Sequence, residues 1–253
     1  MHTNMELPSN PFKMTTLFEA GMAKKDASKF VKGKLDDEGM KLLAAFVDEI
    51  LEHQETEIEP KFNMMGRECT MHRKILFLAN LADVLGYFYS GGVAPSVKPG
   101  PAAVAFQTYV NKKMNVESNG MLINIYEDGT KYISAHSDDE KGLDTEMGVI
   151  IISAGATRKM KFRKAKKAPP GVPELDYRTG DVNLEHGSVV HMAGPGFQRS
   201  FTHELPPMKA VKERRISITL RNHSYGDEKR FEAAMKRKGE MAEQPTAKRV
   251  KAE

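Results

Sequence analysis

Two side chains that commonly bind metals lie two positions apart in the middle of the chain, at His136 and Asp138. They end a strand-like run, and residues two apart on an extended strand point to the same face, so both can reach one cation. His203 is the candidate for a third ligand. Two imidazoles and one carboxylate form the facial triad that holds non-haem Fe(II) and leaves positions open for a co-substrate and dioxygen. The alternative for each histidine is a structural role, because His-x-Asp alone is weak evidence.

A second polar group lies on one face of the segment 215–221. Polar and apolar residues alternate there, with Arg215, Ser217, Thr219 and Arg221 on one face and Ile216, Ile218 and Leu220 on the other. Burying two like charges on one face requires an anion, and a small dicarboxylate fits because the guanidinium fork pairs with a carboxylate through two hydrogen bonds. The alternative is a solvent-facing strand whose arginines extend into water.

The segment before the His-x-Asp pair has the same alternation. Asn124 and Tyr126 share one face, whereas Ile123 and Ile125 share the other. This pattern is expected when one face of a strand lines a pocket and the other packs into a core.

Short strands must position these residues. Strand-like segments recur at regular intervals, at 120–127, 131–136, 147–154, 158–163, 188–193, 199–205 and 213–221, which is typical of a β-sandwich or jelly roll. Helices are predicted over residues 36–51 and from Pro101, because apolar residues recur there at helical spacing. The fold class is therefore mainly β with flanking helices (α+β).

The chain divides into four predicted parts. Residues 1–35 have little apolar periodicity and predict a flexible leader with at most a short helix near Leu17 to Phe30. Residues 36–117 predict a helical support and a lid, and residues 118–223 the jelly-roll core. Residues 224–253 predict a basic tail, mostly disordered.

Composition limits the class of protein. The 253 residues carry a net charge of +4 and a mean hydropathy of -0.49, and Cys69 is the single cysteine. One cysteine excludes an intramolecular disulfide and a cysteine-rich zinc site. No segment predicts a membrane span or a signal peptide, so we expect an intracellular protein. Basic residues crowd residues 158–167 and the tail; a solvated surface is the alternative to nucleic-acid binding for such clusters.

The order of several motifs resembles one known family. They are Asn124-x-Tyr126, His136-x-Asp138, Gly155-Ala156-x-Arg158, His186-Gly187-Ser188, His203 and Arg215-x5-Arg221. Together they look like the AlkB family of Fe(II)/2-oxoglutarate dioxygenases. His-x-Asp-Asp-Glu, Tyr-x-Tyr-Ser-Gly and Gly-Ala-x-Arg most resemble the branch that repairs duplex DNA. The resemblance runs from about Met65 to Asn222 and is strongest from Leu122 onward.

This resemblance implies a double-stranded β-helix, a jelly roll, that binds Fe(II) through the three candidate ligands. It implies that Arg215 and Tyr126 hold the distal carboxylate of 2-oxoglutarate, with Ser217 on the same face, and that Asn124 and Arg221 lie near its metal-chelating end. The implied reaction uses O2 to hydroxylate N-methyl groups of bases such as 1-methyladenine and 3-methylcytosine. It releases formaldehyde, succinate and CO2.

Substrate residues also follow from the resemblance. Tyr87 and Tyr89, followed by Ser90, match lid aromatics that stack on a flipped base, and Glu140 matches an acidic residue facing its edge. For the tyrosines, ordinary strand packing is the alternative. Met65 matches an apolar wedge that fills the gap left by the flipped base. The basic residues from Arg158 to Lys167 are assigned to a strip that contacts phosphates.

The sequence departs from the family pattern within the lid. Gly100 stands where some relatives have a tryptophan, and His72 stands where a proline is usual. Both positions bear on which substrate the lid accepts rather than on the iron site.

The expected partner is nucleic acid, DNA or possibly RNA, with no membrane and a monomeric chain. Residues 245–251 resemble a basic nuclear-import signal, which predicts nuclear delivery. An RNA demethylase of the same fold is the nearer alternative, and a protein hydroxylase or a non-catalytic nucleic-acid-binding module is more distant.

Overall fold

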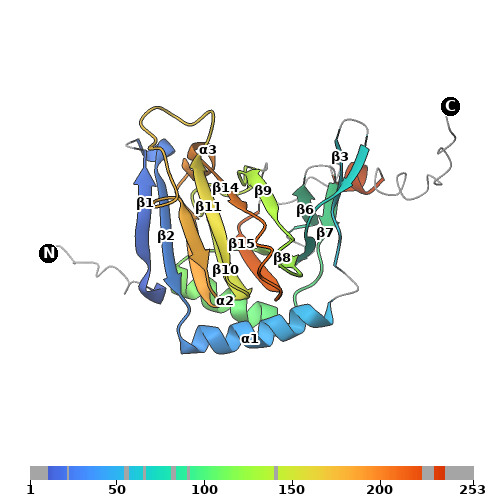
Figure 1. The fold of residues 1–253 in the computed structure, drawn as a ribbon. Helices are drawn as coiled ribbons and strands as arrows, with labels where there is room; N and C mark the ends of the chain where they lie inside the picture. The colour runs from blue at the N-terminus through green and yellow to red at the C-terminus, as the bar shows by residue number, and fades with distance from the viewer. Residues whose placement is uncertain are drawn as a thin grey trace, which may run out of the picture.

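The computed structural model describes residues 11–21, 23–53, 57–64, 67–80, 84–89, 92–139, 142–223 and 231–236. The chain forms two larger antiparallel sheets, with helices on the outer face of one of them (Figure 1). The seven-stranded major sheet has the order β1 (Thr15–Ala20), β2 (Ser28–Lys34), β13 (Ser188–Ala193), β10 (Val149–Gly155), β15 (Arg215–Arg221), β8 (Gly120–Tyr126), β5 (Lys74–Ala79). The four-stranded minor sheet has the order β12 (Asp181–Leu184), β11 (Arg158–Lys164), β14 (Phe201–Leu205), β9 (Ile133–His136).

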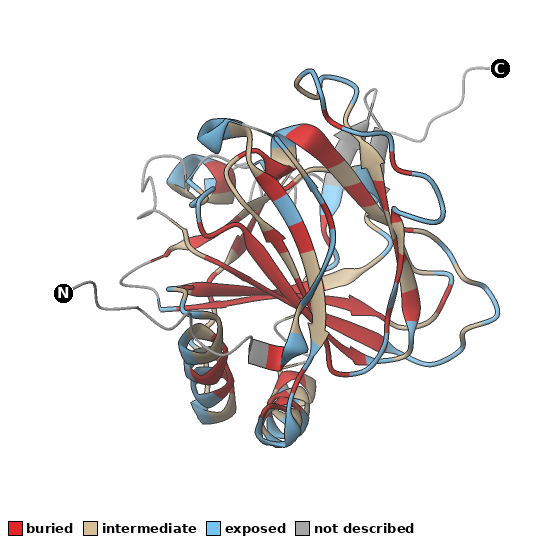
Figure 2. Cartoon of the chain, turned by 90° about the vertical axis from the view of Figure 1, so that its left-hand side faces the viewer, coloured by how far each residue is buried: buried red, intermediate tan, exposed pale blue. Residues whose placement is uncertain are grey.

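Two apolar layers hold this arrangement together. One lies between the sheets and includes Phe30, Phe162 and Phe201. The other lies between the major sheet and the helices. Strand β10 faces both layers, since Ile150 packs toward the helices and Ile151 toward the minor sheet. This is why its first four residues, 149–152, are all apolar instead of alternating with polar ones. Figure 2 shows the buried strands in the centre of the molecule.

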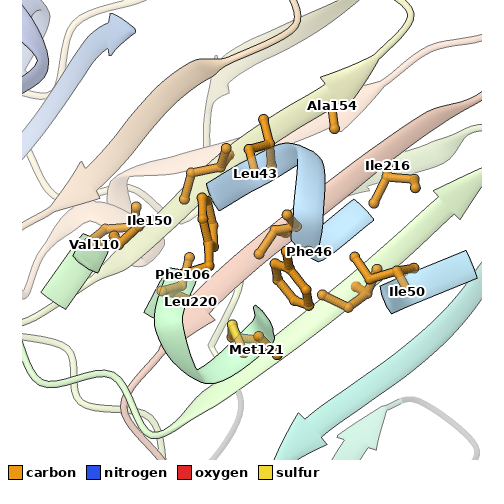
Figure 3. Packing of buried hydrophobic residues seen from close by; sticks show 14 of the residues in the cluster. Leu43, Phe46, Ile50, Phe106, Val110, Met121, Ile150, Ala154, Ile216 and Leu220 are labelled. Atoms are coloured by element: carbon orange, nitrogen blue, oxygen red, sulfur yellow. The ribbon is translucent and has the colours of Figure 1, made fainter. Parts of the chain in front are cut away.

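Two helices cover the outer face of the major sheet. Helix α1 (Asp37–Glu52) begins after Asp36, whose carboxylate accepts a hydrogen bond from the Gly39 N–H, as an N-cap residue does. Helix α2 (Pro101–Met114) begins at a proline, which needs no hydrogen bond there. Figure 3 shows side chains of both helices packed against the sheet: Leu43, Phe46 and Ile50 of α1 and Phe106 and Val110 of α2 against Met121, Ile150, Ala154, Ile216 and Leu220. Both predicted helices are confirmed.

The prediction of a flexible leader is wrong for residues 15–34. Strand β1 pairs with β2, and β2 pairs with β13, so both extend the major sheet. Two short 3-10 helices flank β1, at Pro11–Lys13 and Lys24–Asp26. Among the described residues between Leu17 and Phe30, the only helical segment is the short 3-10 helix at Lys24–Asp26. The cause is packing: Phe18 and Phe30 stack at 5.1 Å within the layer between the sheets, and such long-range burial leaves little trace in a polar local sequence.

Two hairpins lie beside the end of the major sheet. The first joins β3 (Lys61–Met64) and β4 (Arg67–Thr70); the second joins β6 (Gly86–Tyr89) and β7 (Gly92–Pro95). They belong to the segment predicted as support and lid. That segment also supplies β5, which pairs with β8 of the core. The major sheet therefore crosses the predicted boundary between residues 117 and 118.

The predicted fold class, mainly β with flanking helices around a jelly-roll core, is confirmed. All seven predicted strand segments form strands, and within residues 118–223 the sequence pattern missed only β12, a strand of four residues between the predicted segments 158–163 and 188–193. A short helix, α3 (Phe197–Ser200), precedes β14. The part of the predicted tail that the structure describes, residues 231–236, is helical. Among the described residues, no helix is long and apolar enough to span a membrane.

Candidate active site

The three predicted metal ligands meet between two neighbouring strands of the minor sheet. His136 on β9 and His203 on β14 are directly paired across the ladder, and their ring centroids lie 4.3 Å apart. Asp138 follows β9 by two residues, and its carboxylate oxygens lie 3.6 Å from the His136 Nε2 and 3.8 Å from the His203 Nε2. One ligand atom from each residue falls within 4.8 Å of the others. The predicted convergence is therefore present.

Each histidine can offer a neutral ring nitrogen to a metal. The His136 Nδ1 lies 2.9 Å from the Ser134 carbonyl oxygen, which orients the ring and leaves Nε2 for a metal, as is usual for ligating histidines. His203 is almost fully buried. Burial and the nearby His136 lower the pKa of His203 to about 3, so its ring is neutral near pH 7.

Asp138 supplies the negative charge. Burial alone would raise its pKa, but the positive charge of Arg221, 2.8 Å away, together with the adjacent imidazoles outweighs this and lowers the pKa of Asp138 to about 2. Its backbone N–H donates to the Gln198 side chain on α3 at 2.9 Å. Two neutral nitrogens and one ionised carboxylate at this spacing fit a ferrous ion.

Behind the triad lies a buried cationic pocket. Arg215 on β15 is fully buried, and one of its nitrogens donates to the Ser153 hydroxyl at 2.9 Å and contacts the Ser217 hydroxyl at 3.4 Å. Its guanidinium lies 5.5 Å from the Tyr126 ring. Burial lowers the pKa of Arg215 to about 10, so it stays charged at neutral pH. Its Nε has no hydrogen-bond partner among the described residues, which suits a carboxylate ligand.

The face predicted from strand alternation is the one that lines this pocket. A cavity of about 60 Å³ separates the triad from Arg215. Its walls include every residue predicted to bind the oxoacid: Asn124, Tyr126, Arg215, Ser217 and Arg221. The apolar residues of β15 face the helices instead. The residues predicted to bind the oxoacid are therefore gathered at one place, beside the metal ligands.

A larger open cavity of about 610 Å³ adjoins the pocket. Tyr87 and Tyr89 of β6 line it together with His136. The two tyrosine rings are stacked at 6.4 Å, and the Arg221 guanidinium lies 5.4 Å from the Tyr87 ring. Burial raises the pKa of Tyr89. The remaining predicted substrate residues of the lid, Met65, Ser90 and Glu140, lie outside the described residues.

Comparisons with known proteins agree with this geometry. The 2OG-Fe(II) oxygenase superfamily matches residues 33–221. The DNA oxidative demethylase ALKBH2 of Homo sapiens is 30% identical over 185 residues, 70% of this chain and 69% of that protein. The alpha-ketoglutarate-dependent dioxygenase alkB homolog 3 of Rattus norvegicus is 33% identical over 106 residues, 41% of this chain and 35% of that protein. This chain belongs to the AlkB family of Fe(II)/2-oxoglutarate dioxygenases.

One solved structure, described as "The structure of OsALKBH1", aligns over 76% of this chain and 97% of that chain at 16% identity and a TM-score of 0.44. Family membership and the triad together establish the use of Fe(II), 2-oxoglutarate and O2 by this AlkB-family chain.

One predicted substrate residue has a structural role in this AlkB-family chain. Arg158 is fully buried, and its guanidinium donates to the carbonyl oxygens of Asp128, Lys131 and Pro206 at 2.8 to 3.1 Å. The prediction that Arg158 contacts phosphates is therefore wrong. Alternation along β11 explains this, since Arg158 shares its face with Met160 and Phe162, both of which pack in the interior.

Other members of the predicted phosphate strip point outward but pair with acids. Arg163 lies 2.8 Å and Lys159 3.7 Å from Asp181 of the neighbouring strand, and Lys164 lies 3.3 Å from Glu174. These ion pairs reduce the positive charge available for phosphates at this face of the AlkB-family fold. The alternative of a solvated surface fits these three side chains better.

Two residues that sequence reasoning missed support the site. Gln198 holds the backbone of Asp138, and the Arg73 Nε donates to the Asn124 side-chain oxygen at 2.7 Å. Arg73 also lines both cavities. Arg73 immediately precedes β5, in which Ile75 is paired directly with Asn124, so period-two alternation places Arg73 on the cavity face. The role of Arg73 could be predicted only if the pairing of β5 with β8 were already known.

Proposed function

We propose that this AlkB-family dioxygenase removes methyl groups from nitrogen atoms of DNA bases such as 1-methyladenine and 3-methylcytosine. The single observation that carries the proposal is the open cavity that shares His136 with the metal centre and has Tyr87 and Tyr89 on its walls. Aromatic walls suit a flat base taken out of its stack. The name of the human relative, a DNA oxidative demethylase, supports the same substrate class.

The residues of the chain have separate tasks in this proposal. Arg215 binds the distal carboxylate of 2-oxoglutarate, and Asn124 and Arg221 lie toward its keto-acid end. Iron, when bound, activates O2 with the oxoacid as reductant. One oxygen atom enters the N-methyl group to give N–CH2OH, and the other enters succinate as CO2 leaves. The N–CH2OH group then loses formaldehyde and restores the N–H of the base.

The test is anaerobic reconstitution with iron, followed by exposure to air with 2-oxoglutarate and a panel of methylated oligonucleotides. We expect formaldehyde and succinate in equal amounts from at least one methylated DNA. His136→Ala and Asp138→Ala should abolish both products because each removes a metal ligand, whereas His53→Ala at the end of α1 should not. A panel in which no methylated DNA releases formaldehyde above the His136→Ala background overturns the proposal.

The same panel separates DNA from RNA. Faster turnover of methylated single-stranded RNA than of any DNA would establish the RNA demethylase predicted as the nearer alternative. The nuclear delivery predicted from residues 245–251 and the wedge predicted at Met65 concern positions outside the described residues, and both stay predictions. Met65→Ala should impair turnover of duplex more than of single strands, since only a duplex leaves a gap to fill.

A further inference from the structure

Two rings stack at the mouth of the open cavity, and the catalytic site does not use them. The rings of His72 and Tyr132 have centroids 4.3 Å apart and planes inclined by 20°. Both line the cavity that contains Tyr87 and Tyr89. His72 is exposed to solvent, whereas Tyr132 is half-buried. The imidazole is therefore the outer member of the stack.

The inner ring is held by a rigid support. The Tyr132 N–H donates to the His72 carbonyl oxygen at 3.1 Å, which joins the two rings through the backbone as well. Tyr132 follows the loop 127–131. In this loop the backbone carbonyls of Asp128 and Lys131 accept hydrogen bonds from the buried Arg158 guanidinium. The Asp128 carboxylate in turn accepts hydrogen bonds from the Thr130 N–H and hydroxyl at 2.7 and 2.6 Å.

A fixed aromatic surface of this kind favours one class of ligand. Every nucleobase has a flat π face, and stacking on aromatic side chains binds single-stranded bases with little regard to sequence. A support that is already rigid loses little conformational entropy when a base stacks on it. The position matters too, because His136, Ser134 and Ile133 line the same cavity. A nucleic-acid chain in this cavity is therefore within reach of both His136 and the stacked rings.

We propose that the His72–Tyr132 pair is a stacking platform for the nucleobase next to the one that enters the catalytic cavity. This inference rests on the proposed function and deepens it, because the enzyme would then bind at least two consecutive nucleotides of its substrate. The adjacent base must be unpaired or displaced from its own stack to reach the imidazole. A methylated mononucleotide occupies the catalytic cavity alone and gains nothing from the platform.

The test compares two ligands on protein loaded with Mn(II) and 2-oxoglutarate, with no turnover. Calorimetry measures the Kd of 1-methyl-dAMP and of a DNA trinucleotide with 1-methyladenine at its centre. We expect His72→Ala and Tyr132→Ala to weaken trinucleotide binding by about 5-fold or more, the fold-change that corresponds to about 1 kcal/mol of base stacking. Mononucleotide binding should not change, and His72→Phe should restore trinucleotide binding.

Controls separate stacking from misfolding. Tyr177→Ala removes an exposed aromatic ring from the loop before β12 and should leave both affinities unchanged. Thermal unfolding of each variant confirms that it is folded, and His72→Phe keeps a flat ring without the imidazole nitrogens. Tyr132→Phe keeps the inner ring and should bind like the wild-type protein.

Three outcomes overturn the platform. One is wild-type protein that binds the trinucleotide no more tightly than the mononucleotide. Another is unchanged trinucleotide binding in His72→Ala. The third is an equal loss of affinity for the mononucleotide and the trinucleotide in the variants, which would assign the rings to the cavity that holds the methylated base. Because binding is measured without turnover, the platform and the proposed dealkylation can fail separately. If the protein bound the trinucleotide through the platform but released no formaldehyde, the platform would stand and the proposed dealkylation would be rejected.

Discussion

The orientation of the Asn124 side chain decides which groups it presents to the cavity beside the metal ligands. A guanidinium only donates hydrogen bonds, so the atom of Asn124 that faces the Arg73 Nε must be the oxygen. The amide NH2 is then left for a ligand of the cavity that Asn124 lines. Arg73 thus decides that Asn124 presents donors rather than an acceptor to an anionic ligand.

This arrangement predicts the effect of Arg73→Leu on oxoacid binding. Without the guanidinium the amide is free to turn, and its oxygen then repels a carboxylate. We expect the Kd of 2-oxoglutarate to rise by about 10-fold, the lower end of what a hydrogen bond to a charged group contributes. Calorimetry with Mn(II) in place of iron measures it. Arg163→Leu is the matched control on the surface, and an unchanged Kd in Arg73→Leu would refute the assigned role.

The sequence was most informative at the scale of single residues. His136, Asp138 and His203 were found because few residue types bind iron, and Arg215 and Arg221 because two cations on one strand face need an anion. Arg73 and Gln198 were missed because arginine and glutamine have many roles. Their roles follow only from contacts made in the fold. These are the hydrogen bond from Arg73 to Asn124 and the hydrogen bond from the Asp138 backbone to Gln198.

At the scale of elements, the loop between β8 and β9 depends on one buried side chain. Arg158 satisfies three backbone carbonyls, two of them in this loop. The sequence contained the signal for this role, since Arg158 alternates in phase with Met160 and Phe162. The basic neighbours Lys159, Lys161 and Arg163 obscured it, because a charge cluster alone does not say which face of the strand is buried.

The structural role of Arg158 predicts a loss of stability. Arg158→Leu should lower the free energy of unfolding by about 2 kcal/mol or more, because buried carbonyls lose charged donors. Arg163→Leu, on the outer face of the same strand, should change it by less than about 1 kcal/mol, as for exposed ion pairs. Urea unfolding at pH 7 measures both. If Arg158→Leu were as stable as the wild-type protein but bound oligonucleotides less tightly, the phosphate contact would be reinstated.

At the scale of the whole molecule, the strands of the core were predictable and their neighbours were not. Regular spacing of alternating segments is a local signal, so the jelly roll over residues 118–223 could be predicted. Strands β1 and β2 complete the major sheet through contacts with β13 and the minor sheet. Strand β1 is short and mixes polar with apolar residues, and β2 is rich in lysine, so neither local sequence favours one element by itself. Strand β5 is apolar and extended, so its local sequence is typical of a strand. Its pairing with β8, a segment far along the chain, is what could not be predicted.

The whole fold should also respond to its ligands. Arg215 is a buried cation without a carboxylate partner among the described residues, and an oxoacid bound beside a metal would supply one. Ligand at 100 times its Kd adds about 2.7 kcal/mol to the free energy of unfolding, which for a chain of this size raises Tm by about 5–10 °C. Scanning calorimetry with Mn(II) and 2-oxoglutarate measures the shift. Asp138→Ala should abolish it, and a shift that survives in this variant would place the metal elsewhere.

The direct pairing of His136 with His203 makes the active site sensitive to chain length within two short strands. Gain or loss of a single residue inside β9 or β14 would turn one imidazole to the opposite side of the sheet. Most hydrophobic contacts of the major sheet and helices would persist, so such a protein would fold and yet bind no iron. Length changes in the loop Ala165–Gly180, which lies outside this pairing, carry no such penalty. Insertions among relatives with retained activity should therefore be found there and not in β9 or β14.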